Sequence, residues 1–228
     1  VMTIFILVPV IAPTLGQAIL MVANWRAIFA VLAVMALMLF GWFALRQPET
    51  LLPAHRMPFS LQRILLVSRE VCTNRIAFGY TLVAGLVSGA FLGFLSSAAQ
   101  IFQQQYDLGS WFPIYFAVLA SAAGVASLMN ANLVMRFGMR ALIGRAMLSL
   151  AVTSVGFLGF AFLYAGSPPL WSTMAYLLAI FFAIGILFGN LNSLAMEPLG
   201  HVAGIGSALV GSISTLISVP LGILIGHS

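Results

Sequence analysis

Residues 172–195, STMAYLLAIFFAIGILFGNLNSLA, decide the fold of this chain. The stretch contains no Asp, Glu, Lys or Arg, and it is longer than the run of about 20 apolar residues that an α-helix needs to cross a lipid bilayer. A strand of an outer-membrane barrel would instead alternate apolar and polar residues over about ten positions, which this stretch does not do. We therefore expect a membrane-spanning helix here.

The rest of the chain repeats this pattern. Of the 228 residues, 62% are hydrophobic and only 6% are charged, whereas a soluble domain carries about 25% charged residues. Seven apolar segments have no charged residue in their middle, and they lie at about 1–22, 27–45, 76–99, 112–134, 141–164, 172–195 and 203–226. The predicted fold class is therefore all-α, a polytopic transmembrane helical bundle.

The arginines predict how the bundle is oriented in the membrane. All nine basic residues are arginines, and eight of them lie between the second and third segments or around the junction of the fourth and fifth, whereas only Arg26 lies on the other side. Basic loops stay in the cytoplasm, so we expect residue 1 inside and residue 228 outside. Seven spans in this sense do not fit a seven-helix receptor, and a retinal protein needs a lysine that the sequence lacks. The same distribution of charge gives no reason to expect binding to nucleic acid.

The longest polar stretch, residues 46–75, divides the chain. We expect residues 1–45 to be two helices of one half, 46–75 a cytoplasmic linker, and 76–228 five helices of a second half. After Pro58 the apolar and polar residues separate onto two faces of a helix, which predicts an amphipathic helix at the membrane surface. Recognition by a calmodulin-like partner is the alternative reading of this helix.

Several short segments carry a family resemblance. Residues 12–17 (APTLGQ) are similar to an antiporter motif usually written GPxxGG, and Arg136, Gly138 and Arg140 resemble a cytoplasmic loop motif in which Met135 stands in place of an acidic residue. The fullest match comprises Glu197, Pro198, His201, Ala203, Gly204, Ser207, Ala208 and Gly211. Together they resemble the major facilitator superfamily, and within it the Bcr/CflA-type drug exporters, with this chain covering about helices five to eleven of twelve. The chain is then expected to be an incomplete part of a longer protein.

The resemblance implies a central cavity that binds greasy, often cationic molecules. Its contributions from this chain would be Tyr80, Ser88, Phe91 and Ser97 on the seventh helix and Tyr176, Phe181, Phe188 and Asn190 on the tenth. Aromatic faces stack on such ligands and attract cations, while hydroxyl and amide groups orient them. Asn190 is the strongest polar candidate, because a buried amide in a membrane needs a partner.

Other residues are candidates for conformational change. Pro13 and Gly16 on the first segment, echoed by Pro220 and Gly222 on the last, would allow bending and close helix packing, and Arg136, Gly138 and Arg140 would form the inner loop motif. Gly85, Gly89 and Gly93 make a ridge at spacing four, for which we expect plain helix packing. Ordinary packing is also the alternative for the proline and glycine pair.

The implied function is proton-coupled export of a small amphipathic drug by alternating access, from the membrane of a bacterial cell, by a protein that is a monomer when intact. The carboxylates Glu49, Glu70, Asp107 and Glu197 lie in loops or at helix ends, so the coupling group is expected on another helix. The energy source would be the proton gradient, without a cofactor. Glu197 and His201 form a poor metal site, because Pro198 and Gly200 interrupt the helix. A carrier for another small solute is the alternative, and an intramembrane enzyme would need a catalytic constellation that we do not find in the sequence.

Overall fold

The computed structural model describes residues 15–48 and 60–226, and within them the chain forms helices and no strands. Residues 15–22 are helical. The remaining α-helices are α2 (Trp25–Arg46), α3 (Leu61–Thr73), α4 (Arg75–Gln100), α5 (Phe112–Phe137), α6 (Met139–Leu163), α7 (Leu170–Met196) and α8 (Ala203–Gly226). A π-helical turn, η2 (Ile101–Gln105), extends α4, and the 3-10 turns η3 (Gly109–Trp111) and η4 (Glu197–Val202) precede α5 and α8. The predicted all-α fold class is confirmed.

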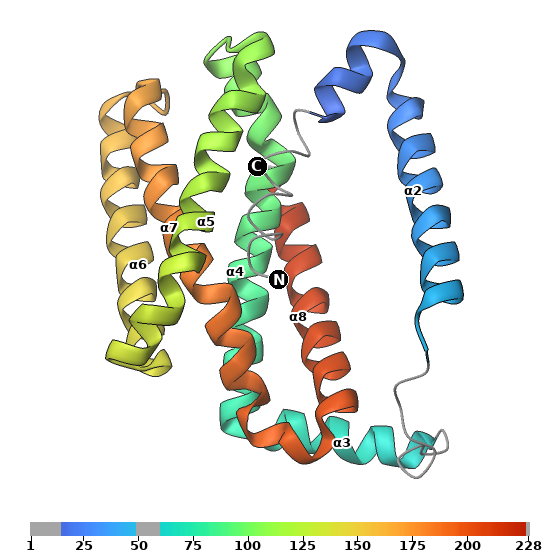
Figure 1. The fold of residues 1–228 in the computed structure, drawn as a ribbon. Helices are drawn as coiled ribbons and strands as arrows, with labels where there is room; N and C mark the ends of the chain where they lie inside the picture. Colours follow the sequence, from blue (N-terminus) through green and yellow to red (C-terminus); the bar gives the residue numbers. More distant parts are fainter. Residues whose placement is uncertain (1–14, 49–59, 227–228) are drawn as a thin grey trace.

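Five unbroken helical stretches of the described residues are long and apolar enough to cross a membrane. The last of them, Leu170–Gly226, contains two crossings, because the chain reverses at η4 and α8 runs back beside α4 (Figure 1). Six of the seven predicted segments therefore have a helix, with bounds that differ from the prediction by a few residues. In the remaining segment, 1–22, residues 15–22 are helical, whereas residues 1–14, which include Pro13, lie outside the described residues.

Helices α4 to α8 form one bundle, in which α4 packs against α8 and α7 packs against α4, α5 and α6. Three hydrophobic clusters lie among its helices, and one of them, which includes Ala77, Ala195 and Val210, also takes in Val67 and Val71 of α3. A second cluster includes Leu142, Ile143, Leu187 and Leu191, and a third surrounds Phe102 and Phe181. Helix α2, by contrast, has no buried residue and is drawn apart from this bundle in Figure 1.

The glycine ridge of α4 explains how closely α8 approaches. Added Cβ atoms at Gly85, Gly89 and Gly93 would lie within 2.9 Å of side-chain atoms of Ile217, Leu221 and Ile225. Real Cβ atoms do not approach other atoms this closely, so each glycine accommodates one bulky residue of α8. The packing role predicted for the ridge is confirmed.

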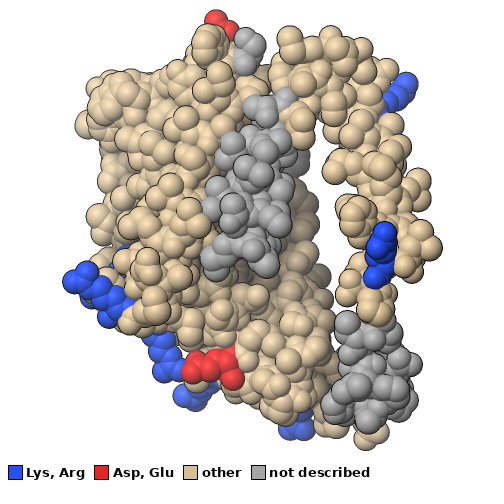
Figure 2. Space-filling view, in the orientation of Figure 1, with Lys and Arg blue, Asp and Glu red and all other residues tan. Residues whose placement is uncertain are grey.

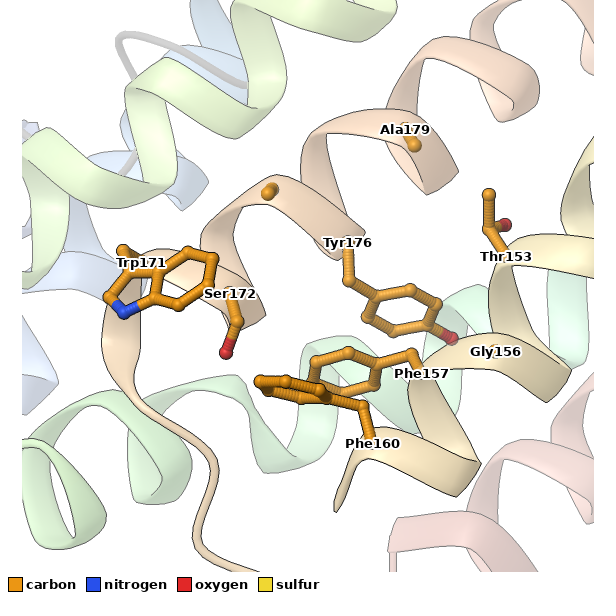
Figure 3. A pocket seen from close by; sticks show the side chains of 9 residues that line it. Thr153, Gly156, Phe157, Phe160, Trp171, Ser172, Tyr176 and Ala179 are labelled. Atoms are coloured by element: carbon orange, nitrogen blue, oxygen red, sulfur yellow. The ribbon is translucent and has the colours of Figure 1, made fainter. Parts of the chain in front are cut away.

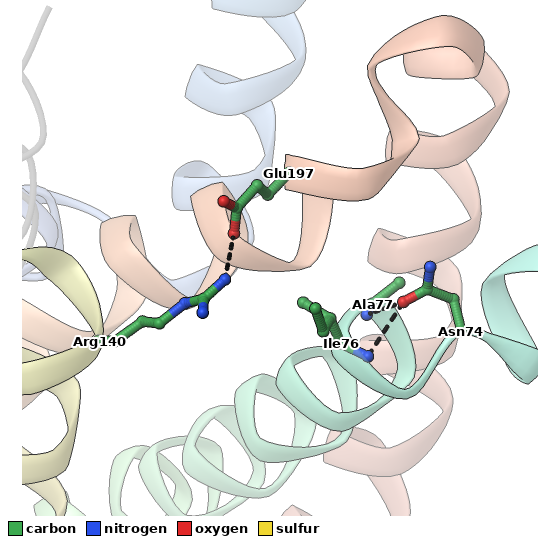
Figure 4. A network of polar contacts seen from close by, with 5 residues as sticks. All are labelled: Asn74, Ile76, Ala77, Arg140 and Glu197. Carbon is green, nitrogen blue, oxygen red and sulfur yellow. Dashed lines mark hydrogen bonds and ion pairs between the residues drawn. The ribbon is translucent and has the colours of Figure 1, made fainter.

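Helix α3 lies across one end of the bundle (Figure 1), and Asn74 alone separates it from α4. The Asn74 side chain caps α4 by accepting hydrogen bonds from the backbone N–H groups of Ile76 and Ala77, both at 3.0 Å (Figure 4). Val67 and Val71 of α3 are buried against Leu199 and Val210. Leu61, Leu65 and Leu66 remain exposed. An amphipathic helix thus forms where the sequence predicts one, with one apolar stripe packed on the bundle and another left uncovered.

Candidate functional site

Asn190, the strongest polar candidate, is 3% exposed and lies between α5 and α7, toward the end of the bundle that carries the α5–α6 junction. Its Nδ2 donates hydrogen bonds to Oδ1 of Asn130 at 2.7 Å and to the carbonyl oxygen of Ile186 at 2.9 Å. Asn130, 7% exposed, returns a bond of 3.3 Å to Oδ1 of Asn190. Both amide hydrogens of Asn190 are therefore used within the protein.

Three predicted aromatic residues come together between α4 and α7. Phe91 meets Phe181 and Phe188 edge to face, with ring centroids 5.6 and 5.9 Å apart. Phe181 is 3% exposed and also contacts Phe94 and Phe116, so it is a core residue, whereas Phe188 is 39% exposed. Of this aromatic cluster, Phe188 offers the accessible ring.

The Tyr176 ring points toward α6 (Figure 3). Its ring is stacked on Phe157, with centroids 4.2 Å apart and planes inclined by 1°, and its hydroxyl lies 3.2 Å from the Ser154 hydroxyl. It lines a pocket of about 370 Å³ between α6 and α7. None of the other seven binding candidates lines this pocket.

The remaining candidates lie on α4. Tyr80 is half-buried and packs against two of the hydrophobic clusters. Ser88 is half-buried near the middle of the helix. Ser97 donates its hydroxyl to the carbonyl oxygen of Gly93 at 3.1 Å. The eight predicted residues thus divide among an aromatic cluster, an amide pair, a pocket and the packed face of α4.

The inner loop motif forms the junction of α5 and α6. Gly138 is the only residue between these helices, and it has φ +78° and ψ 151°, a conformation that only glycine adopts without strain. Arg136 and Arg145 place their guanidinium groups 5.3 and 4.5 Å from the ring centre of Phe137. A one-residue turn therefore sets the angle at which α6 leaves α5.

Arg140, in the first turn of α6, forms an ion pair with Glu197. The distance between its Nη2 atom and Oε2 of Glu197 is 3.1 Å, and the two side chains are 62% and 53% exposed (Figure 4). Glu197 belongs to η4, and His201 of the same turn places Nε2 3.1 Å from Oε1 of Glu70 on α3. Turn η4 is thus connected to α6 on one side and to α3 on the other.

Charges gather at this end of the bundle. Figure 2 shows Arg atoms along the end formed by α3 and the α5–α6 junction, while the middle of the visible face of α4 to α8 is uncharged. This distribution matches the loops that the positive-inside rule assigns to the cytoplasm. Among residues 15–48 and 60–226, no group of three or more His, Cys, Asp or Glu residues could hold a metal ion.

Two residues of the α5–α7 interface were not among the functional residues predicted from the sequence. Asn130 is one of two amides in its apolar segment, with Asn132, so the reasoning applied to Asn190 would have pointed to this pair without distinguishing between its members. At Gly185 the two helices approach closely, because a Cβ atom there would lie 2.9 Å from Cα of Ala123 and closer still to its carbonyl oxygen. Nothing local in the sequence distinguishes this glycine from its neighbours.

A multi-pass helical bundle with uncharged spans and an arginine-rich inner end defines a polytopic membrane protein. The sequence matches the Major Facilitator Superfamily over residues 1–222. The chain belongs to that superfamily, and it is a multi-pass membrane protein.

Individual relatives agree with this assignment. The chain is 28% identical to the uncharacterized MFS-type transporter YdgK of Bacillus subtilis over 99% of its own length and 56% of that protein. It is 22% identical to a bicyclomycin resistance protein homolog of Haemophilus influenzae, covering 97% of the chain and 55% of the relative. It is 28% identical to the multidrug resistance protein MdtM of Escherichia coli K12, covering 83% and 46%. The chain thus spans about half the length of these relatives, and no solved structure matches it significantly.

Proposed function

We propose that this chain is part of a secondary active transporter that exports small amphipathic drug-like molecules by alternating access, in the inner membrane of a bacterium. The observation that carries the proposal is the superfamily match over residues 1–222, combined with relatives that are named for drug and bicyclomycin resistance. The close packing of helices α4 to α8 agrees with such a role, because closely packed helices can move as one body.

Within this chain, the aromatic cluster of Phe91, Phe181 and Phe188 supports a binding role best. Phe188 presents a ring that a flat or cationic ligand can stack on, while Phe91 and Phe181 fix its orientation from behind. Asn190 has both amide hydrogens engaged. We therefore assign Asn190 to holding α5 and α7 together, and Phe188 to contact with the substrate.

For energy coupling we propose inward proton flow, with no cofactor and with a monomer as the working unit. Of the described carboxylates, Glu70 lies on α3, Asp107 before α5 and Glu197 in η4, all at the ends of the spans. A proton carrier must change its exposure during transport, which suits a group inside the bundle. Glu49 lies outside the described residues, and the sequence places it in the polar linker. We therefore propose that the coupling carboxylate lies outside this chain, in the intact protein.

The test uses the intact protein in cells that lack their own drug exporters. Dye accumulation is measured with and without a proton gradient, for the native protein, for Phe188→Ala and for Phe162→Ala, which alters an exposed ring of α6. We expect the native protein and Phe162→Ala to lower accumulation only when a gradient is present, and Phe188→Ala to lose most of that effect. If the native protein transports a solute that is not a drug and does not transport the dye, the proposal of a drug exporter is wrong. The alternative, a carrier of the same superfamily for another small solute, then takes its place.

A further inference from the structure

Two apolar pockets flank the outer half of α7. The pocket of about 370 Å³ reaches α6 and is lined there by Thr153, Gly156, Phe157 and Phe160. A second pocket, of about 480 Å³, reaches α5 and is lined there by Ile114, Tyr115 and Val118. Trp171 and Ala175 line both, so α7 separates two grooves that meet at these residues.

The grooves follow from how α5 and α6 are joined. The single residue Gly138 holds them together at the inner end, and they diverge toward the outer end (Figure 1). The outer half of α7 lies beside this opening. Gly156 has no side chain and Ala179 has only a methyl group, which deepens the space on the α6 side (Figure 3). Ala175 of α7, which also lines the pocket, is equally small.

The walls of the α6 groove are preformed. Phe157 and Tyr176 stack face to face, Phe160 meets Trp171 edge on at 6.3 Å, and the Tyr176 hydroxyl is engaged by Ser154. No charged side chain lines either groove. The grooves are therefore suited to hydrocarbon and have no counter-ion for an anionic or cationic group.

The position of the grooves points to lipid. They open at the end opposite the arginine-rich loops, and the adjoining face of α6 exposes Leu148, Val152, Val155 and Leu158 as a lipid-facing helix does. Trp171 is 69% exposed at the start of α7 and Tyr164 is 47% exposed at the end of α6. Exposed Trp and Tyr at helix ends mark the level where acyl chains meet headgroups.

We propose that the two grooves hold one phospholipid of the outer leaflet, with one acyl chain on each side of α7 and the glycerol backbone at Trp171. The two grooves are similar in volume and meet at one point, as the two chains of a phospholipid do. Since no charged residue lines the grooves, binding is independent of headgroup charge. This site is separate from the aromatic cluster around Phe188 and does not depend on the proposed transport.

The test is native mass spectrometry of the intact protein, purified in mild detergent after equilibration with phosphatidylcholine or phosphatidylglycerol. Gly156→Leu obstructs the α6 groove, and Ala175→Leu obstructs the junction of both. Ala151→Leu, at an exposed position of α6 outside the grooves, is the matched control. Thermal unfolding of each variant verifies that it is folded.

We expect one retained phospholipid of either headgroup on the native protein and on Ala151→Leu, and at least a tenfold lower retained fraction on folded Ala175→Leu, with Gly156→Leu between them. The proposal is overturned if the native protein retains no lipid, as when another helix of the intact protein covers the grooves. It is equally overturned if retention is unchanged in Ala175→Leu, if it requires phosphatidylglycerol, or if a transported dye displaces the lipid one for one.

Discussion

At the scale of single residues, the Asn130–Asn190 pair has the clearest energetic consequence. Each amide is buried in the bundle, so removing one leaves the other without its partner. We expect Asn130→Ala and Asn190→Ala each to destabilise the protein by about 1–2 kcal/mol, within the range for polar contacts between membrane helices. Unfolding of the purified intact protein in mixed micelles measures this change.

The double variant tests whether the two amides act as a pair. We expect Asn130→Ala with Asn190→Ala to cost less than the sum of the single changes, because the second substitution removes a group that is already unpaired. Additive costs would show that the two side chains do not interact in the membrane.

Gly185 and Gly189 provide a matched comparison on α7. A Cβ atom at position 185 would collide with the backbone of Ala123, whereas one at position 189 meets nothing within 4 Å. Gly185→Ala should therefore force α5 and α7 apart at a cost of roughly 1–3 kcal/mol. Gly189→Ala should be neutral or stabilise the helix by up to about 1 kcal/mol. The same unfolding measurement distinguishes the two, and equal effects would contradict the close approach of the helices.

At the scale of elements, turn η4 connects the inner ends of the bundle. The Arg140–Glu197 pair is exposed, so its loss should change stability by less than about 1 kcal/mol. Its expected role is to hold η4 against α6 during transport. Arg140→Glu should lower dye export in cells, and Arg140→Glu with Glu197→Arg should restore it. A double reversal that stays as inactive as the single change would show that the pairing is not what matters.

The helices themselves could be predicted from the sequence, because an apolar run of fixed length and the absence of charge are local properties. Helix α8 has the predicted bounds, residues 203–226, and α7 extends the predicted 172–195 by a few residues. The faces of these helices could not be predicted. Helix α7 is apolar all round, so its periodicity does not show that Tyr176 faces α6 while Phe188 faces α4.

The site was predictable only in part for the same reason. The need of a buried amide for a partner identified Asn190, but the partner lies 60 residues away along the chain. The approach of Gly185 to Ala123 and the stacking of Tyr176 on Phe157 likewise depend on how distant helices cross. Such contacts are set by packing between helices, which hydropathy does not encode.

At the scale of the whole molecule, the arginine distribution predicts which end of the bundle faces the cytoplasm, and exposed positions at the two ends allow this to be tested. Cys72 is exposed on α3, at the arginine-rich end, and Ser167 is exposed in the turn between α6 and α7, at the opposite end. We expect a membrane-impermeant maleimide to label Ser167→Cys in intact cells, in a protein with its other cysteines replaced. Cys72 should react only after the cells are permeabilised.

This pattern follows from the cost of moving charge through lipid, because helix α3 with Arg63 and Arg69, and the α5–α6 junction with Arg136 and Arg140, should not cross the membrane. Gly200→Cys in η4 provides a second inner position, since its Cβ atom would meet nothing within 4 Å. If the reagent labelled Cys72 and Gly200→Cys from outside intact cells, the orientation of the protein in the membrane would be the opposite of the predicted one. It would then also place the grooves beside α7 in the inner leaflet, so the sidedness of the lipid depends on this measurement.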